Sequence, residues 1–261
     1  MGAGIPPFQK HTVLNTVGKD STVMDTPKYK RVLLKLSGEA LADKSGKDIL
    51  DHAKLDEVAK VIKKALDMKV QVAIIVGAGN IWRGRQASEL DRVRADHMGM
   101  LATMINCIAL EDAIKRAGAV CHVMSAVTVE SFAERFDRKL AVEALERGEA
   151  VIFGAGLGIP FVSTDTAAAV RAAEIGADMI LFAKNIDGIY SADPKLDPNA
   201  VHYDSVTYDF ILENNLKVMD QTAASFCREN KLNMLVFALD NPESILDALS
   251  GNISGTVVTV D

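Results

Sequence analysis

The sequence predicts an α/β protein, a three-layer αβα sandwich with a mostly parallel central sheet. The first observation behind this prediction is that short runs rich in β-branched residues alternate with segments of helical periodicity from residue 30 onward. The second is that glycine and polar residues follow most of these runs. Strands that alternate with helices build a largely parallel sheet with helices on both faces. A chain of 261 residues is long enough for one such domain.

The expected strands are short and largely apolar. They are residues 31–36, 70–76, 121–125, 150–153, 179–184, 233–239 and 256–260. Two of the intervening segments place apolar residues on one helical face. The first face consists of Leu55, Val58, Ala59, Ile62, Ala65 and Leu66, and the second of Met98, Leu101, Ala102, Ile105, Ile108 and Ala109. For the second face, periodicity leaves open whether it is ordinary core or an interface with another chain.

Another helix is expected within "PFVSTDTAAAVRAAEIGAD", where Ser163 or Thr164 is the N-cap and Gly176 ends the helix. A helix N-terminus preceded by hydroxyl groups favours the binding of a phosphate. Asp165 lies in the first turn of this helix. Its carboxylate can serve only the helix dipole, or it can hold a magnesium–phosphate assembly or orient a lysine.

The charge balance argues against two classes of binding protein. Lys and Arg number 29 and Asp and Glu number 35, which gives a formal charge of -6. This balance speaks against a general nucleic-acid or membrane-surface binder, so an anionic ligand has to be met by a local site. No run reaches the roughly 18 to 20 apolar residues of a transmembrane helix. Residues 1–27 lack an apolar signal core and are expected to be a flexible extension of a domain at residues 28–261.

The cysteines Cys107, Cys121 and Cys227 are far apart in the sequence and show no C-x-x-C spacing. They are therefore interpreted as reduced core residues rather than a disulfide or zinc framework. A cytoplasmic location follows from this interpretation.

Ligands of an open parallel sheet collect at the carboxyl ends of the strands. In "RVLLKLSGE", Lys35 lies near the end of an otherwise apolar strand, where a buried amine needs an anion or carboxylate close by. By alternation it shares a strand face with Leu33, so its polar partner is expected on that side. The alternative is a lysine on an edge strand that discourages aggregation.

The segment from Gly77 to Asn80, "GAGN", follows the next expected strand. Small residues there let backbone N–H groups approach an anion, although an ordinary turn explains the glycines equally well. Arg83 favours the anion site, because a guanidinium binds phosphate oxygens through paired hydrogen bonds. For Arg85 and Arg94, an exposed basic loop remains the alternative.

Several common signatures are absent from the sequence. There is no G-x-x-x-x-G-K-[ST] loop and no G-x-S-x-G nucleophile motif. The glycines at 154, 156 and 158 lack the spacing of a dinucleotide fingerprint. The histidines show no H-x-x-x-H or H-E-x-x-H spacing, so no metal site held by the protein alone is expected.

The motifs "KLSGE", "GAGNIWRG", "ADHMGMLAT", "STDTAAA", "NIDGIYSADP" and "LKVMD" stand in the order and spacing typical of the bacterial uridylate kinases. The chain resembles this group, which belongs to the amino acid kinase family, over essentially residues 28–261. The resemblance implies the amino acid kinase fold and transfer of the γ-phosphate of ATP to UMP, with Mg²⁺ bound mainly through the nucleotide phosphates. It further implies a UMP-binding part at about residues 28–180 and an ATP-binding part at about residues 181–261 plus the Lys35 loop.

The resemblance also assigns residues to roles. Catalytic roles fall to Lys35, Arg83, Asp165 and Asp220. ATP contacts fall to Lys35, Leu36, Ser37, Gly38, Gly79, Arg83, Lys184, Asn185, Tyr190 and Asp193, of which Lys184, Asn185, Tyr190 and Asp193 are adenosine-side contacts. UMP contacts fall to Ala78, Asp96, Leu157, Gly158, Ile159, Pro160, Phe161, Val162, Ser163 and Thr164.

Members of the family respond to GTP and UTP and usually assemble as homohexamers, so both effectors and a homo-oligomer are expected partners. Two other functions stay open at this point. One is another small-molecule kinase of the same fold that phosphorylates a carboxylate or carbamate. The other is a non-catalytic nucleotide-binding storage or sensor protein.

Overall fold

The computed structural model describes residues 26–43, 45, 47–82, 89–194, 196–239, 241–252 and 255–261. Most of the expected extension, residues 1–25, lies outside the described residues. Arg83 and Arg85 lie outside them as well.

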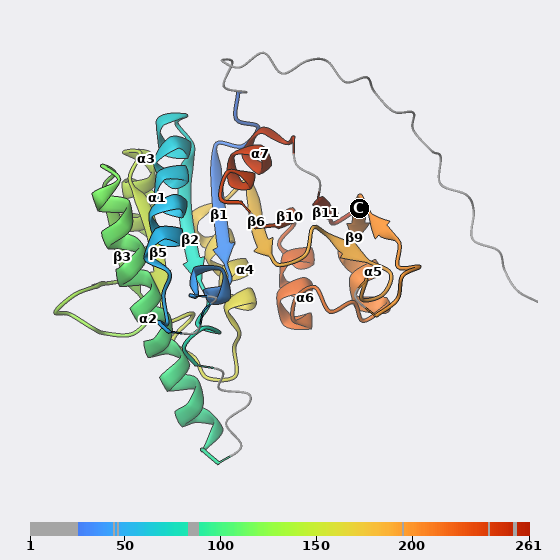
Figure 1. Cartoon of the computed structure of the whole chain (residues 1–261), viewed down its shortest axis with the longest axis horizontal. Helices are drawn as coiled ribbons and strands as arrows, with labels where there is room; N and C mark the ends of the chain where they lie inside the picture. The colour runs from blue at the N-terminus through green and yellow to red at the C-terminus, as the bar shows by residue number, and fades with distance from the viewer. Residues whose placement is uncertain are drawn as a thin grey trace, which may run out of the picture.

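A largely parallel sheet forms the middle layer of the molecule (Figure 1). Within the described residues, the strand order is β4-β3-β5-β2-β1-β6-β10-β11-β9. The strands are β1 (Arg31–Leu36), β2 (Gln71–Val76), β3 (Cys121–Ser125), β4 (Glu134–Arg135), β5 (Ala150–Gly154), β6 (Met179–Lys184), β9 (Ser205–Thr207), β10 (Met234–Ala238) and β11 (Gly255–Thr259). Only the β10–β11 pair of this sheet is antiparallel. The short strands β7 (Ile189–Tyr190) and β8 (His202–Tyr203) form a separate antiparallel pair.

Helices cover both faces of the sheet and complete the three layers (Figure 1). One face carries α1 (His52–Asp67), α2 (Arg92–Arg116) and α7 (Ser244–Ser250). The other carries α3 (Arg138–Glu146), α4 (Thr164–Ile175), α5 (Tyr208–Glu213) and α6 (Gln221–Glu229). A short 3₁₀ helix, η1 (Gly38–Leu41), follows β1. None of the helices in the described part of the chain combines the length and the apolar character that crossing a bilayer requires.

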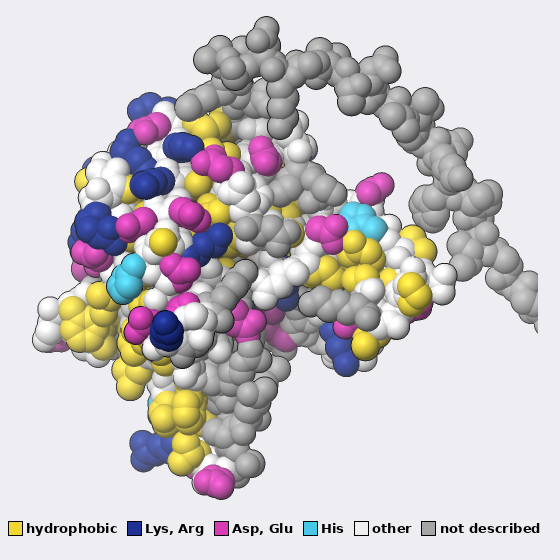
Figure 2. Space-filling view, in the orientation of Figure 1, with side chains coloured by type: hydrophobic (Ala, Val, Ile, Leu, Met, Phe, Trp, Pro, Cys, Tyr) yellow, Lys and Arg dark blue, Asp and Glu magenta, His cyan; other side chains and the backbone are white. Residues whose placement is uncertain are grey.

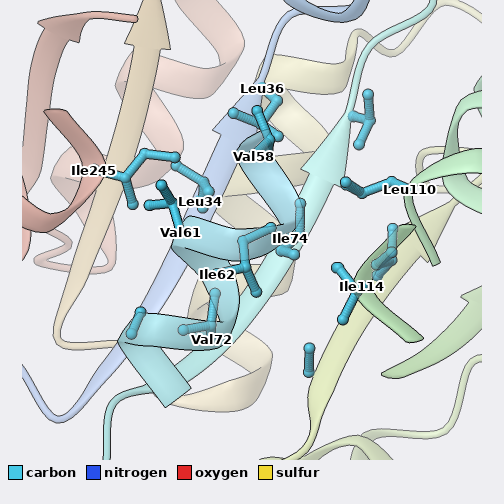
Figure 3. Close-up of a cluster of buried hydrophobic side chains, with 14 of the residues drawn as sticks. Leu34, Leu36, Val58, Val61, Ile62, Val72, Ile74, Leu110, Ile114 and Ile245 are labelled. Carbon is cyan, nitrogen blue, oxygen red and sulfur yellow. The ribbon is translucent and has the colours of Figure 1, made fainter. Parts of the chain in front are cut away.

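The central strands are apolar on both sides because each face is covered by helices. Leu36 of β1 lies beside Val58 of α1, and Leu34 lies beside Val61 (Figure 3). Leu33 belongs to the cluster on the opposite face, under α3 to α6. Alternation along one strand therefore supplies two separate cores.

The expected α/β architecture is confirmed, and the expected strands at 31–36, 121–125 and 179–184 match β1, β3 and β6. The other expected strands begin or end one residue away from the observed bounds. Sequence reasoning missed β4, β7, β8 and β9, because strands of two or three residues are too short to display a period.

The apolar face expected on α2 is mostly turned away from the core. Met98, Leu101, Ile105 and Ile108 are 38 to 56% exposed, whereas Ala102 is buried. The α2 stripe, as we call these four exposed side chains, is therefore not core packing. The lower part of α2 projects beyond the sheet in Figure 1, and Figure 2 shows hydrophobic side chains gathered along it.

Candidate active site

The site lies where parallel strands end. The carboxyl ends of β1, β2, β5 and β6 reach the same edge of the sheet, and the loops that follow them lie there together with the start of α4 (Figure 1). This is the edge at which open α/β sheets bind ligands. Its polar side chains come from segments that are far apart in the sequence.

Lys35 of β1 forms an ion pair with Asp165 of α4, with 3.0 Å between Nζ and Oδ1. Lys35 is opposite Phe182 in the β1–β6 register, and its Nζ lies 4.7 Å from the centre of that ring. The amine and Asp165 lie on the Leu33 face of the sheet, as alternation predicts. The edge-strand alternative is wrong, because β1 pairs with β2 on one side and β6 on the other.

Lys184, at the end of β6, places a second amine in the same region. Its Nζ lies 4.8 Å from the centre of the Phe182 ring. Burial lowers the pKa of Lys184, the neighbouring Lys35 lowers it further, and Asp165 opposes the shift. Two amines and one carboxylate leave a net positive charge, which suits an anionic ligand.

The start of α4 is held by a network of hydroxyl groups. Ser163 is the N-cap, and its Oγ accepts the N–H groups of Asp165 and Thr166 at 3.0 and 3.2 Å. Asp220, the N-cap of α6, accepts hydrogen bonds from the hydroxyl groups of Ser163 and Thr166. Asp220 thus ties the starts of α4 and α6 together, and the positive end of the α4 dipole can meet an anion there.

Two glycine loops pack against each other beside this helix start. The N–H of Gly77 donates to the carbonyl oxygen of Leu36 at 2.9 Å. A Cβ atom on Gly38 would lie 2.3 Å from Oδ1 of Asn80 and 2.5 Å from the carbonyl oxygen of Gly77. Only glycine fits at position 38, since any side chain would separate the loops. A Cβ atom on Gly77 would lie 3.6 Å from Oγ1 of Thr164, so these loops and α4 meet at one place.

Asn106 on α2 is a site residue that sequence reasoning missed. It is fully buried, and its Nδ2 donates to the carbonyl oxygen of Gly77 at 2.8 Å and to Oδ1 of Asn80 at 2.9 Å. Nδ2 of Asn80 donates to the carbonyl oxygen of Ile49 at 2.9 Å. The only signal in the sequence is an asparagine next to apolar residues of a helix, which does not reveal its partners.

A cavity of about 140 Å³ opens between α2 and the segment that links β5 to α4. We call it the α2 cavity. It is lined by Ala78, Ala95, Asp96, Gly99, Met100, Thr103, Ala155, Gly156, Leu157, Ile159, Val162 and Thr164. Six of the expected UMP contacts therefore line one cavity, namely Ala78, Asp96, Leu157, Ile159, Val162 and Thr164.

Asp96 shapes the mouth of the α2 cavity. Its Oδ2 accepts the N–H of Phe161 at 2.8 Å, and both carboxylate oxygens lie 3.0 Å from Nε of Arg92. Phe161 has a φ of 68° and a side chain that is 64% exposed. The hydrogen bond that the Phe161 N–H donates to Asp96 thus fixes a backbone conformation that a bulky residue rarely adopts.

A larger cavity, of about 760 Å³, has Lys35 and Lys184 in its lining. We call it the β7 cavity. Its lining includes Lys35, Ser37, Lys184, Asn185, Tyr190 and Asp193, all of them expected ATP contacts. The hydroxyl of Tyr190 donates to Oδ1 of Asp187 at 2.8 Å, which orients the ring at the wall. A third cavity, of about 390 Å³, is lined by Ser163, Asp165, Lys184 and Asp220 together with residues 215–219.

Some expected contact residues are placed differently. The side chain of Leu36 is fully buried in the core on the α1 face, so only its backbone faces the glycine loops. Gly79 lies in the turn after β2. Gly158, Pro160 and Phe161 do not line the α2 cavity, and a Cβ atom on Gly158 would lie 3.1 Å from the carbonyl oxygen of Ala126. Arg83, an expected catalytic residue, lies outside the described residues.

Within the described ranges, no group of three or more His, Cys, Asp or Glu side chains is placed to hold a metal ion. The carboxylates of Asp165 and Asp220 are nevertheless close to the lysines and the helix start. This donor set suits Mg²⁺, which keeps several water ligands and binds through phosphates plus one or two carboxylates.

The fold and this site agree with the comparisons with known proteins. The model of the amino acid kinase family matches residues 30–238. The chain belongs to the amino acid kinase family.

Three solved structures of kinases are similar to this chain. The chain is similar to a UMP kinase of Bacillus anthracis, with 38% identity and a TM-score of 0.85 over 89% of this chain and 97% of the other. A UMP kinase of Ureaplasma parvum is 40% identical, with a TM-score of 0.84 over 89% and 99% of the two chains. A uridylate kinase of Archaeoglobus fulgidus is 31% identical, with a TM-score of 0.66 over 87% and 99%.

Proposed function

We propose that the protein is a UMP kinase, which transfers the γ-phosphoryl group of ATP to UMP and releases ADP and UDP in pyrimidine nucleotide biosynthesis. The observation that carries the proposal is the cluster of Lys35, Lys184 and Asp165 beside the start of α4. Lys35 and Lys184 line the β7 cavity, and Thr164, next to Asp165, lines the α2 cavity. The cluster therefore adjoins a cavity for each nucleotide.

In this proposal UMP occupies the α2 cavity and ATP occupies the β7 cavity. The assignment agrees with a UMP-binding part at about residues 28–180 and an ATP-binding part at about residues 181–261 plus the Lys35 loop. Supporting it, the lining of the β7 cavity includes Tyr190, whose ring offers an apolar surface to a base, and Ser37 of the glycine loop after β1.

Phosphoryl transfer requires mainly positioning and neutralisation of the moving group. The UMP phosphate oxygen is already largely ionised at neutral pH, so no general base is needed for its in-line attack. Lys35 and Lys184 stabilise the charge on the transferred group, and the N–H groups at the start of α4 add to this field. Asp165 keeps the amine of Lys35 in place.

Mg²⁺ supplies charge neutralisation between the phosphate oxygens when the nucleotides are bound. Asp165, which lies beside the two lysines, would be the carboxylate that helps to hold the hydrated ion. Asp220, whose oxygens accept hydrogen bonds from Ser163, Thr166 and Ala223, supports the helix start. Arg83 completes the proposed set as a phosphate-binding guanidinium, on the strength of the sequence motif alone.

The proposal includes a cytoplasmic homo-oligomer, with a hexamer as the expected form and GTP and UTP as effectors. The α2 stripe supports self-association, because four large apolar side chains exposed on one helix favour burial against another surface. A second copy of this chain is the simplest partner for it.

A coupled assay of ADP release tests the proposed function. Purified protein is supplied with Mg·ATP and one acceptor at a time, namely UMP, CMP, dCMP, aspartate, glutamate or carbamate, with and without GTP and UTP. UMP is expected to give the highest kcat/KM, with UDP identified by chromatography. Preference for an amino acid or carbamate would establish a different kinase of the family. ATP binding without UDP formation would establish a non-catalytic nucleotide-binding protein.

A further inference from the structure

Helix α2 bonds directly to the segment that walls the α2 cavity. The Oγ1 of Thr103 accepts the backbone N–H of Ala155 at 2.9 Å and donates to the carbonyl oxygen of Met100 at 2.7 Å. Thr103 is 4% exposed and Ala155 is fully buried, so the bond between them is shielded from water although both residues line the α2 cavity. The hydroxyl of Thr103 thus donates a hydrogen bond within α2 and accepts one from the segment that walls the cavity.

Ala155 needs this support because of its backbone conformation. Its φ is 59°, in the left-handed region that disfavours any residue with a Cβ atom. Gly156 and Gly158 follow with φ values of 58° and 70°. The N–H of Gly158 closes the turn by donating to the carbonyl oxygen of Ala155 at 2.9 Å. The strained residue is therefore the first of a turn whose shape sets the rest of the wall.

The packing around this turn leaves it little freedom to adjust. A Cβ atom on Gly154, at the end of β5, would lie 2.3 Å from Sδ of Met104 on α2. A Cβ atom on Gly158 would lie 3.1 Å from the carbonyl oxygen of Ala126. The turn is thus enclosed between α2 on one side and the segment after β3 on the other.

We infer that Thr103 is a positioning residue for the acceptor nucleotide. Its hydroxyl holds Ala155 in the left-handed conformation, and through the 155–158 turn it sets where Leu157, Ile159 and Thr164 face the α2 cavity. The inference deepens the proposed function and rests on it. No equivalent link connects Thr103 to the β7 cavity in the described part of the chain, so the effect is expected to be selective for the acceptor.

Four variants of the full chain test the inference. Thr103→Val keeps the shape and removes the hydroxyl, whereas Thr103→Ser keeps the hydroxyl. Ala155→Gly removes the strain, and the double variant Thr103→Val/Ala155→Gly removes both. Thr259→Val is the matched control, because within the described residues its hydroxyl donates to the backbone of the exposed Asp261, at 2.7 Å. Melting temperatures are recorded for all, and Thr103→Ala replaces Thr103→Val if the latter does not fold.

Thr103→Val is expected to raise the KM for UMP about tenfold, the change that accompanies loss of one buried hydrogen bond, and to leave the KM for ATP within about twofold. Thr103→Ser and Thr259→Val are expected to behave like the wild type. In the Ala155→Gly background, the effect of Thr103→Val is expected to shrink to about threefold or less, because glycine adopts a positive φ without a Cβ penalty.

Hydrogen exchange gives a readout that is independent of turnover. Thr103→Val is expected to speed exchange of the Ala155 amide and its neighbours by at least about tenfold, with Thr103→Ser protected as in the wild type. Unchanged exchange at Ala155, equal changes in both KM values, or an undiminished effect in the Ala155→Gly background would each overturn the inference. The assay of the wild type with the different acceptors tests the proposed function separately. The KM values of the variants are then compared for whichever acceptor the wild type phosphorylates.

Discussion

The Nζ of Lys35 lies 3.0 Å from Oδ1 of Asp165, and the two side chains are only 9% and 18% exposed. Burying a charged pair costs desolvation that its attraction rarely exceeds, so such a pair is weak evidence of a stabilising role. Its place at the end of a parallel sheet, beside a second, half-buried lysine, favours a functional role. This relationship leads to the first prediction.

Lys35→Met is expected to lower kcat by a factor on the order of 10³. Removing a cationic side chain that stabilises the transferred phosphoryl group has an effect of this size in other phosphotransferases. It also leaves Asp165 without its cation, so the free energy of unfolding should fall by about 3 kcal/mol. Adding Asp165→Asn should recover stability but not turnover. Lys63→Met, which removes an exposed pair with Asp67, is the control. Turnover near that of the wild type would contradict the assignment of Lys35.

The lowered pKa of Lys184 predicts how kcat/KM for ATP changes at alkaline pH. Because burial and Lys35 lower its pKa, Lys184 loses its proton at a lower pH than an ordinary lysine. Its positive charge is therefore present below that lowered pKa and lost as the pH rises through it. As the pH rises, kcat/KM for ATP should therefore start to fall at a pH below the ordinary lysine pKa of about 10.4. Lys184→Arg should shift this alkaline limb of the pH profile to higher pH. An unchanged limb in Lys184→Arg would rule out Lys184 as its origin.

The position of Asp220 predicts that its substitution affects turnover in addition to stability. Asp220→Ala removes the α6 N-cap, at a cost of about 1 kcal/mol, and releases Ser163 and Thr166 at the start of α4. Asp137→Ala removes the N-cap of α3, away from the site, and should cost a similar amount of stability. Only Asp220→Ala is expected to reduce kcat, by at least about tenfold. Equal turnover in the two variants, measured beside urea unfolding, would leave Asp220 a purely structural cap.

Asn106 predicts an effect on both nucleotides. Asn106→Ala deprives the carbonyl oxygen of Gly77 and the side chain of Asn80 of their partner, which should destabilise the fold by about 1–3 kcal/mol. Because Gly77 also packs against Gly38, the KM for ATP and the KM for UMP should both rise. Asn230→Ala is the control, because in the described part of the chain the side-chain amide of this C-cap residue donates to the carbonyl oxygen of Phe226 in α6. A change confined to one KM would disprove this coupling of the two loops.

The α2 stripe predicts the oligomeric state. Ile105→Asp places a charge among the three other exposed apolar side chains of the stripe, so it should lower the mass measured by light scattering after size exclusion. Leu140→Asp, on α3 and 48% exposed, carries the same chemical change elsewhere and should leave the mass unchanged. Equal masses for Ile105→Asp and the wild type would show that the stripe is not an interface.

Much of the fold was predictable because it depends on local pattern. The alternation of apolar strands and helical segments indicated the parallel sheet, and the period of two along β1 placed Lys35 on the Leu33 face. The hydroxyl residues Ser163 and Thr164 indicated the start of α4, and of these two candidates Ser163 is the N-cap. These features depend on near neighbours in the sequence, which a reader of the sequence can see.

Only the tertiary structure decided which of these faces meet. The period of α2 identified an apolar stripe, yet it could not show that the stripe is exposed while Thr103 and Asn106 face the site. Likewise, the sequence could not show that Lys184 and Lys35 share the ring of Phe182. By itself the sequence determined the elements and the faces of each, because periodicity is local. The pairing of those faces was decided by packing, because contacts between segments far apart in the chain leave no period in the sequence.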